Sequence, residues 1–493
     1  MLQSFDSRPV SPKAIRPGVG VLLLSASNAF RLAVQFLLFP VLAHLLSPSD
    51  YGLIGMAMPL VLFALTLGDG GMGPALLRAS DPEGEIETTM FWAALGTGIV
   101  CAAMLGLAAP LAGTLLKNKH ITPVLLCLAP VMVLSALSSV PAVRVQKSGA
   151  TWIFAVGDVI STLGGAAVAF AAALSGWGVW SLVFQQLVIW LAKFVVMLRL
   201  AGIRVRGRPK RSALAYLLSH GTALVGSNLL NLFSISIDAL LVGRMLGAAQ
   251  LGYYVLAFQV VRIPEALLNG PVFVSFLPAL TQLNLDRAAG AALFLRTARM
   301  MLFISAPVML GLALTADLSV PLLLGARWHH SVPVLMILAP TAVLQTIGWL
   351  SRAVLVGYGR SGLQFRISVL NAAAILAGVL AGLHAGIVGI ALGVSLAVAA
   401  GNSLYIIAAA RELRLSPQAL ARPIMPILGA AALMCLAVGV SRLAAFNQLQ
   451  PLPALALAAG IGVLTYGGAL MLFAPDMVNP DTLQLWRRAR MTS

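Results

Sequence analysis

Residues 19–46 read VGVLLLSASNAFRLAVQFLLFPVLAHLL and carry a single Arg or Lys, Arg31, near the middle of the run. About 20 predominantly apolar residues are enough for a helix to cross a bilayer, so the run predicts a membrane-spanning helix. A guanidinium at the bilayer centre costs ~2.5–3.5 kcal/mol even on insertion-based scales. We therefore expect Arg31 to face a hydrated cavity lined by protein, where it can bind an anion.

The rest of the chain has the same apolar character. Of its 493 residues 60% are hydrophobic and 10% are charged, and the mean hydropathy is +0.95. These values predict an all-α polytopic membrane protein, and the even number of spans counted below puts both termini on one side. The fourteen predicted transmembrane helices are 19–43, 53–76, 88–110, 123–146, 153–174, 177–199, 215–238, 252–278, 299–323, 332–356, 364–382, 386–410, 424–442 and 453–473.

The basic residues predict the orientation, because loops rich in Lys and Arg stay in the cytoplasm. With the N-terminus inside, 22 basic residues fall on the cytoplasmic side, five fall outside and five lie within spans. The net charge of +17 is then mostly a topology signal that also attracts anionic lipids of the inner leaflet. We therefore expect both termini in the cytoplasm, membrane lipids as partners, and no nucleic acid.

The chain contains an internal repeat. A shift of 200 residues pairs Asn28 with Asn228 and Gly52 with Gly252, and it places LLSPSDYGLIGMA over MLGAAQLGYYVLA. Two six-helix lobes related by pseudo-two-fold symmetry, with two extra C-terminal helices, follow from this repeat. The predicted parts are a cytoplasmic tail 1–18, an N-lobe 19–199, a basic cytoplasmic linker 200–214, a C-lobe 215–410, spans 13 and 14 at 424–473, and a cytoplasmic tail 474–493.

Polar side chains recur at helical spacing in the first two spans of the lobes. A polar stripe on an apolar helix is typical of a wall that faces the protein interior, and it predicts a substrate-binding surface. Hydrogen bonding between helices, without any ligand, explains lone amides equally well. The residues are Asn28, Arg31 and Gln35 in span 1, Asn228 and Asn231 in span 7, and Gln259, Arg262 and Glu265 in span 8.

Other ionisable residues inside spans have two interpretations each. Arg352 and Arg366 either bind an anion or extend to the headgroups, and we expect Lys193 to extend to the headgroups. Asp158 and Glu265 are candidates for proton coupling, because buried carboxylates can carry protons in a transport cycle. A structural salt bridge is the alternative for both carboxylates, and Glu265 is one helical turn from Arg262.

Signatures of catalysis are missing from the sequence. It contains no phosphate-binding loop, no HExxH and no GxSxG motif, and its connections are too short to fold an extramembrane domain. The three cysteines lie inside apolar runs without metal-ligand spacing, so we expect neither a metal nor a cofactor. These features favour a carrier over an enzyme.

Two segments carry a resemblance to a known family. FRLAVQFLLFPVLAHLLSPSDYGLIGMAMPLVLFALTLGDGGMGPALLR (residues 30–78) and DALLVGRMLGAAQLGYYVLAFQVVRIPEALLNGPVFVSFLPALTQL (residues 238–283) resemble the polysaccharide-transporter (Wzx-like) flippases. These belong to the multidrug/oligosaccharidyl-lipid/polysaccharide (MOP) superfamily. The resemblance covers nearly the whole chain.

The resemblance implies a flippase of the bacterial inner membrane. Such a protein turns undecaprenyl-pyrophosphate-linked oligosaccharide repeat units across the membrane for O-antigen, capsule or exopolysaccharide, by alternating access through a cationic central cavity. Arg31 matches the cavity wall by position, and Arg262, Arg352 and Arg366 match it by charge and span. The resemblance further implies that spans 13 and 14 form a groove for the prenyl chain, and that polysaccharide polymerase and chain-length machinery are partners.

Two alternatives remain open at this point. A multidrug cation antiporter of the same superfamily would share the architecture, but it should have an acidic, aromatic cavity. A membrane polysaccharide polymerase or ligase is the competing enzyme, and it should place acid and base groups on a large outer loop. Five basic residues within spans argue against the first, and the short connections argue against the second.

Overall fold

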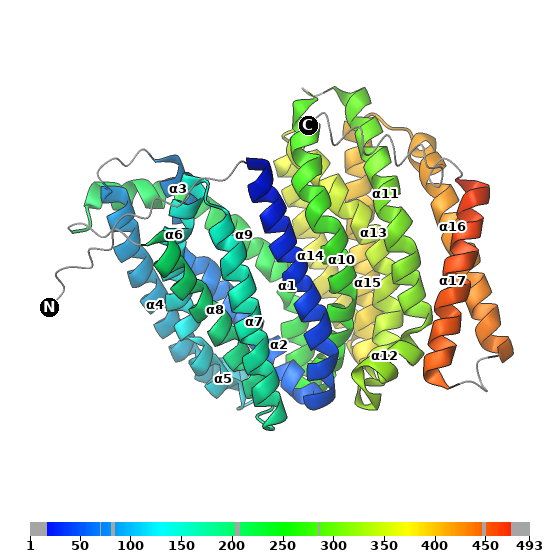
Figure 1. The fold of residues 1–493 in the computed structure, drawn as a ribbon, viewed down its shortest axis with the longest axis horizontal. Helices are drawn as coiled ribbons and strands as arrows, with labels where there is room; N and C mark the ends of the chain where they lie inside the picture. Colours follow the sequence, from blue (N-terminus) through cyan, green and yellow to red (C-terminus); the bar gives the residue numbers. More distant parts are fainter. Residues whose placement is uncertain are drawn as a thin grey trace. The chain divides into compact units, whose positions relative to one another are not determined.

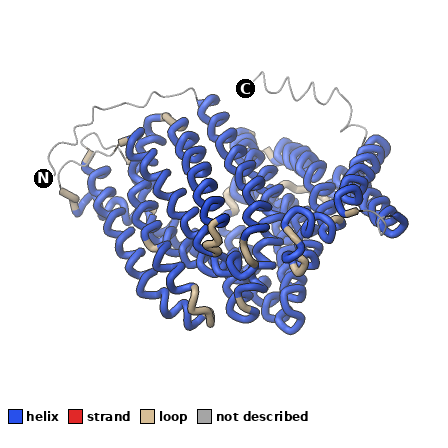
Figure 2. Tube along the Cα trace, turned by 60° about the horizontal axis from the view of Figure 1, so that its bottom comes forward, coloured by secondary structure: helices blue, strands red, loops and turns tan. Residues whose placement is uncertain are grey.

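The computed structural model describes residues 17–69, 71–79, 84–202, 208–283, 286–445 and 450–474, and these residues form helices and short connections (Figures 1 and 2). The helices are α1 Pro17–Leu45, α2 Pro48–Asp69, α3 Met72–Arg78, α4 Glu85–Leu115, α5 Ile121–Leu128, α6 Pro130–Ser148, α7 Trp152–Leu174, α8 Val179–Ala201, α9 Arg211–Leu246, α10 Ala248–Gln282, α11 Arg287–Leu314, α12 Ala316–Leu324, α13 Ser331–Gly357, α14 Ser361–Gly382, α15 Gly386–Glu412, α16 Pro417–Ala445 and α17 Pro451–Phe473. Two single 3₁₀ turns, η1 Ala326–Trp328 and η2 Leu383–Ala385, precede α13 and α15.

Within the described ranges, twelve helical stretches are long and apolar enough to cross a membrane. One of them, Ser361–Glu412, joins α14 and α15, which we predicted as two spans, and α9 contains the predicted span 215–238. The chain is therefore an all-helical, multi-pass membrane protein. The count of fourteen spans stays a prediction.

The boundaries predicted for the ninth span, 299–323, are wrong. α11 begins at Arg287, because the side chain of Asp286 accepts hydrogen bonds from the amides of Ala288 and Ala289 and caps the helix. It ends at Leu314, and the separate short helix α12 follows. Arg287 and Arg296 lower the hydropathy of the first turns of α11. The start of the span was therefore predicted too late in the sequence.

The chain divides into two compact units, Met1–Val255 and Leu256–Ser493. In the first unit, α1 packs on α7, α4 and α8 pack on α6, and α2, α3 and α4 pack on α9. In the second, α13 packs on α11 and α15, and α14 packs on α15. The boundary lies inside α10 rather than in the basic linker, and the predicted lobes 19–199 and 215–410 stay a prediction.

The start of α2 is held by a network around Asp50. Its carboxylate accepts a hydrogen bond from the amide of Ser47 at 2.9 Å, and its own amide donates to the hydroxyl oxygen of Ser47 at 3.3 Å, which is a capping box. It also accepts one from the amide of Val179 at the start of α8, at 2.9 Å. Tyr51 lies edge-on against Phe39 of α1, with ring centres 6.3 Å apart. The SPSDYG segment therefore fixes the junction of α1, α2 and α8.

The two glycines that the repeat pairs lie against each other's helices. A Cβ on Gly52 would be 1.7 Å from the carbonyl oxygen of Ala248, and a Cβ on Gly252 would be 1.8 Å from that of Pro48. The first turns of α2 and α10 therefore touch backbone to backbone. No other residue type permits this approach without moving the helices apart.

A second close approach joins α14 and α15. Each helix has a GxxxG motif, GVLAG at 378–382 and GIALG at 389–393. A Cβ on Gly378 would be 2.4 Å from the carbonyl oxygen of Gly393, and a Cβ on Gly382 would be 2.3 Å from that of Gly389. Small residues at this spacing let membrane helices pack tightly. The seam sets the position of α15, which carries part of the site described below.

The C-terminal pair α16 and α17 is attached to α11 and α12 (Figure 1). Arg442 of α16 donates to the carbonyl oxygen of Leu314 and pairs with Asp317 of α12. Tyr466 of α17 donates to the carbonyl oxygen of Phe303 at 2.9 Å. These polar contacts fix how α16 and α17 are oriented against α11 and α12, where the remaining contacts are mostly apolar.

Candidate functional site

The second unit contains a partly buried cation without a carboxylate partner among the described residues. Arg352 lies on α13, about 8 Å along the helix axis from its C-terminal end at Gly357. Its guanidinium carbon is 5.0 Å from the ring centre of Trp349 on the same helix and 4.5 Å from that of Tyr405 on α15. Both distances are within the range of cation–π attraction, so the aromatic rings hold the charge in place.

Hydrogen bonding satisfies this guanidinium only in part. One Nη of Arg352 donates to the side-chain oxygen of Asn402 on α15 at 3.4 Å. Its Nε is buried and has no acceptor among the described residues. The amide of Asn402 lies over Gly348, where a Cβ would be 1.9 Å from its oxygen. An unsatisfied donor on a cation inside a span is typical of a group that binds a ligand.

A polar stripe of α10 adjoins the aromatic side of this cluster. Asn269 of α10 and Trp349 of α13 line one small pocket, together with Phe276 and Met301. The side-chain oxygen of Asn269 and one carboxylate oxygen of Glu265, one turn earlier, are buried without a hydrogen-bond partner among the described residues. Asn269 was not among the predicted site residues, although its spacing of four from Glu265 places it on the predicted stripe.

The first unit has a second intramembrane cation. Arg31 of α1 donates to the side-chain oxygen of Asn28 at 2.7 Å, so these two residues share a helix face as predicted. In the described part of the chain, Arg31 has no ion pair with a carboxylate. Gln35, one turn further, is partly buried like both of them.

The structure brings together some predicted residues and not others. Gln259 is partly buried, whereas Arg262 and Arg366 are exposed. Arg262 forms no ion pair with Glu265 in the described residues, so the alternative of a salt bridge within α10 is not seen. The side chains of Asn228 and Asn231 lie outside the described residues.

The acidic residues differ in their partners. Asp158 pairs with Lys193 at 2.9 Å, so the expectation that Lys193 extends to the headgroups is wrong. The pairing arises because α7 and α8 pack closely and place the two side chains side by side. Asp238 of α9 is buried and accepts a hydrogen bond from Tyr254 at 2.9 Å. Its partner lies 16 residues away on the next helix, so sequence spacing gave no signal.

The site suits binding rather than bond-making chemistry. Arg352 supplies a charge and an unsatisfied donor, Trp349 and Tyr405 supply aromatic faces, and Asn402 supplies an amide. Guanidinium groups recognise phosphate oxygens, and flat aromatic rings pack well against amphipathic ligands. Within the described residues, His, Cys, Asp and Glu form no group of three that could hold a metal ion.

Comparison with known families decides which kind of binding protein this is. The family model of a polysaccharide biosynthesis protein matches residues 41–333, more than half of the chain. The chain belongs to this family. This match, together with the relatives below, confirms the predicted resemblance to the polysaccharide transporters, which are transporters rather than enzymes.

Relatives of known role support the same assignment. The chain is 26% identical over 370 residues to the succinoglycan biosynthesis transport protein ExoT of Rhizobium meliloti (strain 1021), covering 74% of each chain. It is 25% identical over 335 residues to the lipopolysaccharide biosynthesis protein WzxC of Escherichia coli (strain K12), covering 67% of each. It is 24% identical to the teichuronic acid biosynthesis protein TuaB of Bacillus subtilis (strain 168), covering 67% of this chain and 69% of that protein.

Solved structures share the fold. The lipid II flippase MurJ in an inward closed conformation superposes with a TM-score of 0.73 at 12% identity, covering 94% of this chain and 99% of that one. An inward-facing multidrug resistance transporter of the MATE family gives a TM-score of 0.65 at 13% identity, covering 78% and 94%. The family match ends before Arg352, so the residues of the site rest on the geometry above.

Proposed function

We propose that the protein is a flippase of the bacterial inner membrane that translocates undecaprenyl-pyrophosphate-linked oligosaccharide repeat units for surface or exported polysaccharide. The observation that carries this proposal is Arg352, an intramembrane cation held between two aromatic rings with no carboxylate beside it. Its charge suits a pyrophosphate, and Trp349 and Tyr405 suit a sugar. The names of the relatives, which include succinoglycan transport and lipopolysaccharide biosynthesis, support a polysaccharide substrate.

The proposed cycle is alternating access through a cationic path. The head group of the lipid-linked sugar needs positive, hydrated surroundings inside the bilayer, while the prenyl tail stays in hydrocarbon. Arg31 with Asn28 supports such a path in the first unit, and Arg352 supports it in the second. Further contacts with the head group are proposed for Gln35, Gln259, Arg262 and Arg366. Contacts of Asn228 and Asn231 are proposed from the sequence alone.

Coupling and topology complete the proposal. Glu265 is the proposed proton carrier, because its buried oxygen has no partner in the described residues, whereas the pairing of Asp158 with Lys193 favours a structural role. Both termini are proposed to be cytoplasmic, from the distribution of Lys and Arg. We also propose that α16 and α17 contact the prenyl chain and that polysaccharide polymerase and chain-length machinery act alongside the protein.

Reconstitution tests the function directly. Purified protein is placed in liposomes with a lipid-linked oligosaccharide, and access of a lectin to sugar on the opposite face is followed over time. Arg352→Gln should lower the initial rate about tenfold or more, as expected for losing one charge-assisted contact. Arg422→Gln removes the same charge from an exposed position on α16 and should leave the rate unchanged.

The same liposomes separate the proposal from its rival. A multidrug cation antiporter shares this fold, as the MATE structure shows, and it would export a cationic dye against a proton gradient. Dye transport with no movement of the oligosaccharide would refute the proposed function. Loss of rate in Arg422→Gln equal to that in Arg352→Gln would refute the role given to Arg352.

A further inference from the structure

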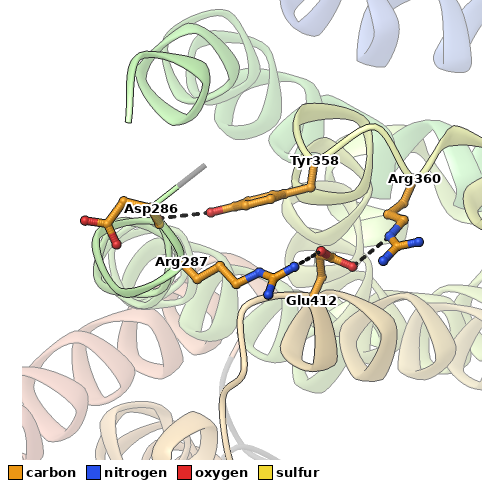
Figure 3. A network of polar contacts seen from close by, with 5 residues as sticks. All are labelled: Asp286, Arg287, Tyr358, Arg360 and Glu412. Carbon is orange, nitrogen blue, oxygen red and sulfur yellow. Dashed lines mark hydrogen bonds and ion pairs between the residues drawn. The ribbon is translucent and has the colours of Figure 1, made fainter. Parts of the chain in front are cut away.

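At one end of the second unit, a charged pocket lies outside the site described above. It is lined by Arg287, Tyr358, Gly359, Arg360 and Glu412, and with its open mouth it encloses about 690 Å³ (Figure 3). The lining comes from the start of α11, the turn between α13 and α14, and the end of α15. Three connections that are distant in sequence thus meet around one space.

The two arginines are held by one carboxylate. Glu412 accepts from Arg287 with one oxygen at 3.0 Å and from Arg360 with the other at 2.9 Å. Arg287 uses an Nη and Arg360 uses its Nε, and the remaining N–H groups of both have no partner in the described residues. Figure 3 shows the two arginines on either side of Glu412. The guanidiniums are therefore fixed while most of their donors stay free.

The carboxylates around the pocket are already engaged. Glu412 is only 12% exposed and is shared by the two arginines. Asp286 caps α11 through the amides of Ala288 and Ala289. The exposed Arg414 lies two residues after Glu412 in the sequence and adds positive charge. An anion entering the pocket thus meets a positive surplus, and planar guanidiniums favour phosphate among anions.

Tyr358 adds a hydroxyl beside the charges. Burial raises the pKa of Tyr358, Arg287 acts in the opposite sense, and the carboxylates of Asp286 and Glu412 raise that pKa further. The hydroxyl therefore stays protonated at neutral pH, and it donates to the backbone oxygen of Asp286 at 3.2 Å. This bond ties the α13–α14 turn to the start of α11 and keeps the pocket walls together.

The depth of the pocket identifies the source of the phosphate. Arg287 is the first residue of one candidate span, Glu412 is the last residue of another, and Tyr358 and Arg360 lie between two spans. Span ends lie at the level of the lipid headgroups, where phosphates are abundant. Arg31 and Arg352 lie inside spans instead, where a transported head group must pass.

We propose that this pocket binds the phosphate of a resident anionic phospholipid, with Arg287 and Arg360 as its ligands. The bound headgroup would join α11, α14 and α15 at the membrane surface and balance the positive charge that remains after Glu412 and Asp286. The proposal needs the membrane topology but not the proposed substrate. It therefore stands or falls separately from the flippase assignment.

Lipid binding to the purified full-length protein tests the proposal. The protein is held in a neutral detergent, short-chain phosphatidylglycerol is added, and bound lipid is counted by native mass spectrometry. Arg360→Gln should weaken binding about tenfold or more, the fold-change expected for losing one charge-assisted fork. Arg411→Gln is the matched control, because it removes an equal charge one residue before Glu412 without lining the pocket, and it should change binding less than twofold.

Three further outcomes complete the test. Arg287→Gln, on the opposite wall, should weaken binding as Arg360→Gln does, and a gel-filtration profile like that of wild type shows that each variant folds. Equal loss in Arg360→Gln and Arg411→Gln would overturn the proposal in favour of diffuse attraction. Binding of undecaprenyl pyrophosphate that depends on Arg360, with phosphatidylglycerol unaffected by Arg360→Gln, would overturn the assignment to phospholipid.

Discussion

Adding one methyl group at Gly52 should force α2 and α10 apart. The Cβ of Gly52→Ala would be 1.7 Å from the carbonyl oxygen of Ala248, whereas ordinary contacts of this kind are 3.4–4 Å. The first turns of the two helices must therefore separate by about 1.7 Å or more. Overpacking of this kind typically costs ~1–3 kcal/mol, and replacing a helical glycine by alanine returns only about 0.5–1 kcal/mol. We expect a net loss of stability.

The contact is reciprocal, and this allows a sharper test. Gly252→Ala places its Cβ 1.8 Å from the carbonyl oxygen of Pro48, so it breaks the same contact from the other side. Once one methyl has separated the helices, the second should cost little, and the double variant should be less destabilised than the sum of the singles. Gly96→Ala is the control, since nothing lies within 4 Å of its Cβ.

The assay is thermal unfolding of the purified protein in detergent. The fraction of protein that stays monodisperse is measured at each temperature, and the midpoint is the temperature at which half remains. Gly52→Ala and Gly252→Ala should each lower the midpoint, and Gly96→Ala should keep or raise it. Two results would refute the reasoning. The first is a midpoint for Gly52→Ala equal to that of Gly96→Ala, and the second is strict additivity of the two glycine substitutions.

Three further predictions concern other polar and close contacts. Arg352→Lys keeps the charge but loses the planar stack on two rings, so liposome transport should fall between wild type and Arg352→Gln. Asp50→Ala removes an acceptor used by two helix starts and should destabilise the protein by about 1–3 kcal/mol in a denaturant titration in detergent. Gly393→Leu fills the seam between α14 and α15 and should lower the thermal midpoint by more than Gly460→Leu, whose Cβ direction is open.

Hydropathy and helical spacing predicted a large share of the fold. The apolar runs gave the helices, and the spacing of three between Asn28 and Arg31 gave a real contact at 2.7 Å. The repeat paired Gly52 with Gly252, two residues whose helices touch. These predictions succeed because each needs only the residue spacing within one helix, or the comparison of two copies of one sequence pattern.

The partners of buried charges were not predictable in the same way. Tyr405 lies 53 residues from Arg352 in the sequence. The GxxxG motifs that position α15 are visible in the sequence, but they do not indicate which side chains of α13 and α15 come into contact. The pairing of Lys193 with Asp158 depends likewise on how α7 and α8 are rotated. Helix spacing fixes which residues share a face, but tertiary packing decides what that face meets.

The distribution of paired and unpaired charge is the strongest physical argument about the transported molecule. Among the described residues, Asp158, Asp317 and Glu412 each form an ion pair with a basic side chain, whereas the intramembrane cations Arg31 and Arg352 bond only to amides and aromatic rings. Glu265 is one unpaired carboxylate inside a span among the described residues, against these two cations, whereas a carrier of cations would need unpaired carboxylates to predominate in its spans. Keeping two unpaired guanidiniums there costs free energy in every empty protein, and an anionic cargo returns that energy when it binds.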